Sequence, residues 1–193
     1  MNEDHPLLPT TVYAASKAGA EAYVRAFEKS NGLKYVIVRP FNSYGEFMRQ
    51  DGYGAAIPKF YNRISKKRCP IIYGSGKQTR DLTHVEDTVN GIYLASREKK
   101  ALWGTFNIAQ GKEVTIKKVA EIMLKEYSDI IGKKIDFVFE YRKERPGDVK
   151  RHLGDITLSK KVLCYKPKVN LKEGIRRYIN WRLHKNDNIQ LHS

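Results

Sequence analysis

Short apolar segments alternate with helical patterns along this chain, and this alternation most narrows the folds that it can adopt. The apolar segments have the length and the β-branched content of buried strands, whereas the segments between them repeat with helical periodicity. The strands that we expect span residues 33–39, 70–73, 105–109 and 135–141. The helices that we expect span residues 13–30, 55–67, 86–97, 115–131, 157–163 and 171–184. Strands that alternate with helices predict an α/β fold.

The remaining segments are predicted as connections. Residues 41–45 follow a proline and are expected to form a loop, residues 78–87 form a polar segment, and residues 142–149 form a highly charged loop. The apolar positions indicate which helix faces are buried. We expect Ile57, Phe60 and Ile64 to point inward from one helix, and Val89, Ile92 and Tyr93 to point inward from the next.

The first predicted helix carries a tyrosine and a lysine four residues apart. Tyr13 and Lys17 therefore lie on one helix face, one above the other. An ammonium group beside a phenol favours the phenolate, so we expect Lys17 to lower the pKa of Tyr13. A tyrosine tuned in this way can take a proton from a substrate hydroxyl and return it. The same spacing also occurs by chance on surface helices, so the pair alone does not define a site.

A polar side chain follows the first predicted strand. Asn42 comes directly after Pro40 and Phe41, and in open α/β sheets ligands bind at the carboxyl ends of the strands. Asn42 is therefore placed to contact a ligand, although asparagine also serves in ordinary turns.

The chain is strongly basic, with 36 Lys+Arg against 21 Asp+Glu and a formal net charge of +15. Such a charge can attract nucleic acid, a membrane surface or an anionic small molecule. Most lysines stand singly on helical patterns, as on solvated faces, so we expect no nucleic-acid partner.

No apolar run is long enough to span a membrane, and the polar start resembles no signal peptide. Cys69 and Cys164 fit no zinc or redox motif, which predicts two buried thiols in the cytoplasm and no metal site.

Several motifs follow the Tyr-Lys pair in a specific order. They are Arg39-Pro40-Phe41-Asn42-x-Tyr44-Gly45, Ile57-Pro58-x-Phe60, Tyr73-Gly74-x-Gly76-x-Gln78-x-Arg80-Asp81, Val85-x-Asp87, Asn107-Ile108 and Arg145-Pro146-Gly147-Asp148. This order resembles the extended short-chain dehydrogenase/reductases that act on nucleotide sugars, the NAD-dependent epimerase/dehydratase family. Within that family the pattern is most similar to the UDP-glucose 4-epimerases.

The resemblance implies roles for four residues at the cofactor. Tyr13 is expected to be the catalytic acid/base at the sugar C4 hydroxyl, while Lys17 holds the nicotinamide ribose of NAD and keeps Tyr13 acidic. Pro40 and Phe41 are expected to contact the nicotinamide end, Phe41 through its backbone.

The resemblance also implies roles for five residues at the substrate. Asn42 would form a hydrogen bond with the substrate diphosphate, and Tyr73 would lie against the base of the nucleotide. Arg80 and Arg145 would neutralise the diphosphate, which suits the guanidinium fork, and Asp148 would accept from the nucleotide ribose.

Simpler interpretations stay open for three positions. Tyr73 can be ordinary strand packing, and Arg80 can pair only with Asp81. Asp87 is expected to be a helix-start residue rather than a ligand.

The implied architecture is the carboxy-terminal part of a Rossmann-type parallel sheet with a smaller α/β substrate lobe. We expect residues 1–50 to be the remnant of the NAD-binding domain and residues 51–184 to be mainly the substrate lobe, with some segments returning to the sheet. Residues 185–193 are expected to be a flexible tail. The glycine-rich turn of the family's amino-terminal half does not occur in this sequence, and neither does the Ser or Thr that partners the catalytic tyrosine. Glu46 and Ser75 also replace the family's usual proline and aspartate.

The expected function is NAD-dependent epimerisation of a nucleotide sugar, with a UDP-hexose as substrate and transient oxidation at C4. The alternatives are a nucleotide-sugar 4,6-dehydratase and a non-catalytic fragment that binds nucleotide sugars. Because the glycine-rich half is missing, the activity of the isolated chain stays open, and we expect the complete protein to be a homodimer.

Overall fold

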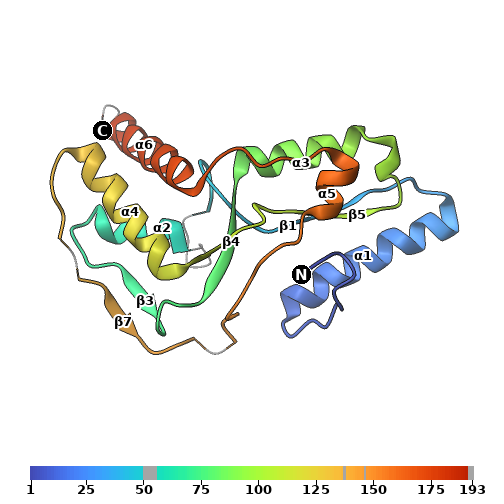
Figure 1. Cartoon of the computed structure of the whole chain (residues 1–193), viewed down its shortest axis with the longest axis horizontal. Helices are drawn as coiled ribbons and strands as arrows, with labels where there is room; N and C mark the ends of the chain where they lie inside the picture. Colours follow the sequence, from blue (N-terminus) through green and yellow to red (C-terminus); the bar gives the residue numbers. More distant parts are fainter. Residues whose placement is uncertain (50–55, 137, 146, 191–193) are drawn as a thin grey trace.

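The structure, a computed structural model, describes residues 1–49, 56–136, 138–145 and 147–190, with side chains as far as residue 184 (Figure 1). The helices in these ranges are α1 (Val12–Asn31), α2 (Ala56–Ile64), α3 (Val85–Arg97), α4 (Ile116–Ile131), α5 (Thr157–Leu163) and α6 (Leu171–Gln190), with a 3-10 turn at Lys99–Ala101. The strands are β1 (Ile37–Pro40), β2 (Asn42–Tyr44), β3 (Ile71–Tyr73), β4 (Thr79–His84), β5 (Thr105–Ile108), β6 (Glu113–Thr115) and β7 (Glu140–Arg142).

The strands form three small sheets, most of whose pairs are parallel. β1 pairs with β5, β2 with β4, and β3 with β7, all in parallel, whereas β6 joins β4 in an antiparallel pair. Helices separate the parallel partners along the chain. The predicted α/β fold is therefore confirmed.

Two hydrophobic clusters lie at opposite ends of the molecule (Figure 1). The first cluster joins α2, α4 and α6 to β3 and β4, and it contains the expected Ile57, Phe60 and Ile64, which are almost fully buried. The second cluster packs α3 and α5 on β5, around Phe106 and Ile108. The domain boundary predicted at residues 50–51 lies outside the described residues, and the domain division stays a prediction.

Several predicted boundaries are wrong. β2 lies in a segment that we expected to be a loop, β4 lies in the segment described as polar, and β6 is a strand for which we made no prediction. β4 was missed because its sequence, Thr-Arg-Asp-Leu-Thr-His, lacks apolar alternation, although its last four residues are buried. The strand expected at 135–141 is β7 and spans only Glu140–Arg142, and the backbone of the expected tail continues α6 to Gln190.

The buried face of α3 also differs from the prediction. Val89, Ile92 and Tyr93 are 59%, 46% and 60% exposed. The helix instead turns Gly91 toward the sheet, where a Cβ atom would lie 2.6 Å from the Ile108 side chain. The absence of that Cβ lets α3 approach β5 closely.

Asp87 in the first turn of α3 explains much of this orientation. Its carboxylate is buried and accepts hydrogen bonds from the backbone N–H groups of Lys168 and Val169, at 2.8 and 2.9 Å. Asp87 therefore lies at the helix start, as expected, and it also holds the segment that leads into α6.

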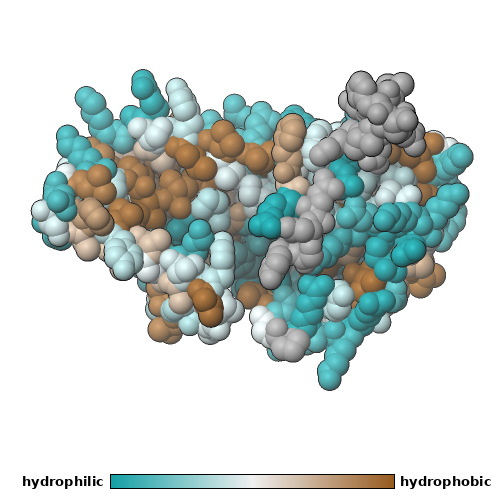
Figure 2. Space-filling view, turned by 180° about the vertical axis from the view of Figure 1, so that it is seen from behind, coloured by the Kyte–Doolittle hydropathy of each residue, from teal (hydrophilic) through white to brown (hydrophobic). Residues whose placement is uncertain are grey.

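None of the side chains of α1 is buried, and polar contacts hold this helix against the sheet. Thr11 caps the helix by accepting from the Ala14 N–H, and Glu21 forms a bidentate ion pair with Arg39 on β1, at 2.7 and 2.8 Å. Hydrogen bonds from Arg39 lower the pKa of Glu21. Figure 2 shows hydrophobic residues gathered on the end of the molecule that contains α1, α3 and β1.

Neither cysteine is fully buried, which corrects the prediction of two buried thiols: Cys69 is half-buried and Cys164 is exposed. Across the described ranges, no helix combines the length and the apolar character needed to cross a bilayer. Among the same residues, no three His, Cys, Asp or Glu side chains gather as metal ligands would.

Asp81 on β4 is fully buried and connects three segments. Its carboxylate accepts hydrogen bonds from the backbone N–H groups of Gln110, Gly111 and Gly154, at 2.9, 3.1 and 3.1 Å. Burial raises the pKa of this carboxyl, and the N–H groups oppose the shift. The sequence between β5 and β6 and the sequence before α5 are thus both held to β4.

We expect Asp81→Asn to lower the free energy of unfolding by about 2–4 kcal/mol, because the new amide NH2 would face buried N–H donors. Urea unfolding measures this change. Asp136→Asn is the control, since Asp136 pairs only at the surface with Lys134 and its side chain is 74% exposed. Equal stability of the two variants would contradict the structural role of Asp81.

Candidate functional site

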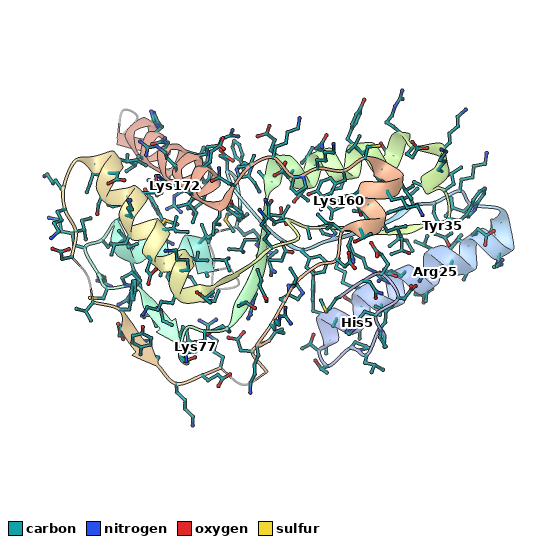
Figure 3. All side chains as sticks on the ribbon, viewed as in Figure 1. His5, Arg25, Tyr35, Lys77, Lys160 and Lys172 are labelled. Carbon is teal, nitrogen blue, oxygen red and sulfur yellow. The ribbon has the colours of Figure 1, made fainter. Side chains whose placement is uncertain are left out.

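A cavity of about 730 Å³ opens between α2 and the strands β2, β3 and β4. Small-molecule sites in proteins typically measure about 300–1,000 Å³. The wall of the cavity includes all five residues that the sequence predicts as substrate ligands, namely Asn42, Tyr73, Arg80, Arg145 and Asp148. Figure 3 labels Lys77 in the turn between β3 and β4, next to Gln78, which lines the cavity.

The pairing of the strands brings these residues together. Asn42 on β2 lies opposite Leu82 on β4, two residues beyond Arg80. Tyr73 ends β3 opposite Arg142 on β7, and the chain then continues to Arg145 and Asp148. Pro146 lies outside the described residues.

α2 contributes one face to the cavity. Ala56, Lys59, Phe60 and Arg63 line it, and their spacing is that of one helix face. Sequence reasoning identified Phe60 as buried but missed Lys59 and Arg63 as cavity residues. The helical spacing from Phe60 was the available signal, yet a lysine on such a face is usually solvated.

Arg80 is engaged with the loop after β7. It forms an ion pair with Asp148, and its Nη1 donates to the carbonyl oxygens of Thr79 and Val149, at 2.8 and 2.5 Å. The alternative that Arg80 only pairs with Asp81 is therefore wrong. Arg80 fixes the position of Asp148 at the edge of the cavity.

Tyr73 and Arg145 contact each other face to face. The guanidinium carbon of Arg145 lies 3.7 Å from the centroid of the Tyr73 ring, within cation–π distance. Hydrogen bonding to Arg145 lowers the pKa of the Tyr73 hydroxyl. Tyr73 is thus more than strand packing, because it positions a cationic side chain at the cavity.

Asn42 is held from two sides. Its Nδ2 donates to the carbonyl oxygen of Asp81 at 3.1 Å, and it lies 2.8 Å from Nδ1 of His152. The His152 ring stacks on Phe41, with 4.8 Å between ring centroids. Burial lowers the pKa of His152, and the charge of Arg80 adds to this. A neutral His152 that accepts at Nδ1 carries its proton on Nε2.

His152 was not predicted from the sequence, which offers no motif for it. In the structure it connects Phe41, a predicted cofactor contact, to Asn42, a predicted substrate contact. The two predicted groups therefore meet through one imidazole.

The predicted catalytic pair lies outside the residues that line the cavity. Tyr13 is 72% exposed, and Nζ of Lys17 lies 5.6 Å from the centroid of its ring, so the two side chains share one open face of α1. The lowered pKa expected for Tyr13 stays a prediction. Pro40 ends β1 on the surface, whereas Phe41 is buried and its N–H donates to the carbonyl oxygen of Ile108 at 2.9 Å.

A second cavity of about 460 Å³ lies at the carboxyl end of α1, where Arg25, Tyr35 and Trp103 are among its lining residues (Figure 3). None of the predicted site residues belongs to it. The larger cavity is therefore the candidate functional site.

Comparison with known proteins identifies similar sequences. The model of a family described as GDP-mannose 4,6 dehydratase matches residues 1–178. The chain is 36% identical, over 190 residues, to a putative UDP-glucose 4-epimerase of Methanocaldococcus jannaschii, and the match covers 97% of this chain and 58% of that protein.

Solved structures share the fold. A UDP-N-acetylglucosamine 4-epimerase from Methanobrevibacter ruminantium, in complex with UDP-N-acetylmuramic acid, matches with a TM-score of 0.85 and 35% identity over 96% of this chain and 57% of that one. A UDP-glucuronic acid 4-epimerase from Bacillus cereus, in complex with UDP-glucuronic acid and NAD, matches with a TM-score of 0.84 and 25% identity over 96% and 56%. The chain thus spans little more than half the length of each of these proteins.

We expect His152 to make the stability of the fold depend on pH. In the unfolded chain a histidine titrates near about 6.5, whereas the pKa of His152 is lower in the folded protein. Below about pH 6.5 the unfolded state therefore binds a proton that the folded state does not bind, and the free energy of unfolding falls.

His152→Gln should reduce the loss of stability between about pH 7.5 and 5.5, as measured by urea unfolding at both values. His184→Gln, which removes an exposed imidazole, is the control. Its free energy of unfolding should fall between the two pH values as much as that of the unmodified chain. The same loss in both variants would contradict a buried, neutral His152.

Proposed function

We propose that this chain, which belongs to the NAD-dependent epimerase/dehydratase family, forms the substrate-binding part and the proton-transfer helix of a UDP-glucose 4-epimerase-like enzyme. One observation carries the proposal. Five residues with the chemistry of nucleotide-sugar ligands, distant in sequence, line one cavity of suitable size.

The cavity residues supply contacts for the nucleotide. Arg145, which has no carboxylate partner in the described part of the chain, offers its guanidinium to a diphosphate oxygen, and the aromatic ring of Tyr73 offers a surface for the base. Asp148, held by Arg80, can accept from ribose hydroxyls. Contacts to the base and the diphosphate leave the hexose free to rotate, which epimerisation requires.

The open face of α1 fits the nicotinamide end of NAD. The Tyr13 hydroxyl and the Lys17 ammonium are neighbours on an exposed helix face, which leaves room for a ligand against both. NAD held on this face would supply the hydride acceptor for the sugar C4. Tyr13 takes the proton of the C4 hydroxyl and later returns it, and Lys17 holds the nicotinamide ribose and stabilises the phenolate.

A second candidate is a nucleotide-sugar 4,6-dehydratase, which the description of the matching family favours. The products separate the two reactions, because a dehydratase forms a 4-keto-6-deoxy sugar and an epimerase inverts C4.

We also propose a homodimer for the complete protein, through α1, which buries none of its side chains here. The two free thiols accord with a cytoplasmic location.

Substrate binding tests the proposal on the chain itself. We expect isothermal titration calorimetry to detect UDP-glucose binding, and Arg145→Met to weaken it about tenfold, because a charged hydrogen bond to the diphosphate is lost. Arg68→Met, at an exposed arginine outside the cavity wall, is the control. Unchanged affinity of the Arg145 variant would contradict the assignment.

Catalysis is tested in a chimera that adds the portion of the Methanocaldococcus jannaschii relative that this chain does not match. Tyr13→Phe should lower kcat for C4 epimerisation by about a hundredfold or more, because the acid/base is lost. Tyr23→Phe is the matched control, since Tyr23 lies on the same helix and is also 72% exposed. Full activity of the Tyr13 variant would contradict its role as the acid/base, whereas a chimera without any epimerase activity would favour the non-catalytic alternative.

A further inference from the structure

Four cationic side chains line the main cavity: Lys59, Arg63, Arg80 and Arg145. Their local partners decide which of them can meet an anionic ligand. Lys59 is the one that neither the motifs nor the family resemblance singles out.

Two of the four cations already have a carboxylate partner, although the partner of Arg63 also pairs with Arg142. Arg63 forms an ion pair with Glu140 at 2.8 Å and donates to the carbonyl oxygen of Cys69. Arg80 forms an ion pair with Asp148 and donates to two backbone carbonyl oxygens. Both guanidinium groups therefore hold the protein together at the cavity wall.

The other two cations have no such partner. Within the described part of the chain, no Asp or Glu forms an ion pair with Lys59 or with Arg145. Arg145 lies over the ring of Tyr73 and hydrogen-bonds with its hydroxyl, and Lys59 is half-buried in the first turns of α2. The cavity therefore presents two unpaired positive charges.

Two like charges beside one cavity destabilise the empty site, and a bound dianion relieves the repulsion. The diphosphate of a nucleotide sugar carries two negative charges. Lys59 adjoins Phe60 on α2, and Arg145 follows β7, so the two cations approach the cavity from different elements.

We infer that Lys59 binds the diphosphate of the nucleotide sugar together with Arg145, and that Arg80 positions Asp148. This inference rests on the proposed function and changes the assignment of charges within its site. The ammonium of Lys59 is a compact point charge on a flexible stem, which can follow a phosphate oxygen.

Titration calorimetry of the chain with UDP-glucose, UDP and uridine tests the inference. Lys59→Met keeps a helix-forming side chain of similar length and removes the charge. We expect this substitution to lower the affinity for UDP-glucose and UDP about tenfold. The affinity for uridine should not change, since uridine carries no phosphate. Lys59→Arg should restore most of the affinity.

Lys66→Met is the matched control, because Lys66 is exposed just beyond α2 and does not line the cavity. Equal affinities of the Lys59 and Lys66 variants for UDP would contradict the inference alone. An equal loss for uridine would contradict it as well, since Lys59 would then act on the nucleoside. Failure of the unmodified chain to bind UDP-glucose or UDP would contradict the proposed function together with the inference.

Discussion

The geometry of the candidate site depends on the buried carboxylate of Asp81. It accepts hydrogen bonds from Gln110, Gly111 and Gly154, and so fixes β4 against two connections. Arg80, the neighbour of Asp81 on the strand, lines the cavity. The backbone carbonyl oxygen of Asp81 accepts a hydrogen bond from Asn42. Because unpaired buried N–H groups cost free energy, one side chain enforces both the fold at β4 and the position of the cavity wall.

Charged groups around the cavity divide into two kinds. Arg63 and Arg80 are satisfied by carboxylates and backbone carbonyls, and they define its shape. Lys59 and Arg145 have no carboxylate partner among the described residues, and they are the two cations that we propose bind the anionic ligand. Under the proposed function, such a site would hold the nucleotide firmly and leave the sugar mobile, as reversible chemistry at both faces of C4 requires. Tyr13, the proposed acid/base, would then have to reach C4 from α1.

Sequence reasoning predicted the fold class, because apolar periodicity reports burial directly, as at Ile57 and Ile64. It failed where tertiary contacts override the pattern. β4 is buried although polar, because its Asp81 is satisfied by backbone groups that are distant in sequence. α3 turns Gly91 inward in place of Val89 because close packing on β5 admits no side chain there. Lys59 and His152 were missed because neither belongs to a motif and their surroundings arise only from the folded chain.

A crystal structure of the chain with UDP-glucose tests the central claim most directly. The account predicts the diphosphate between Lys59 and Arg145 in the cavity formed by α2, β2, β3 and β4, with the base against Tyr73. A nucleotide bound elsewhere on the chain, or a diphosphate in the cavity without contact to Lys59, would contradict it.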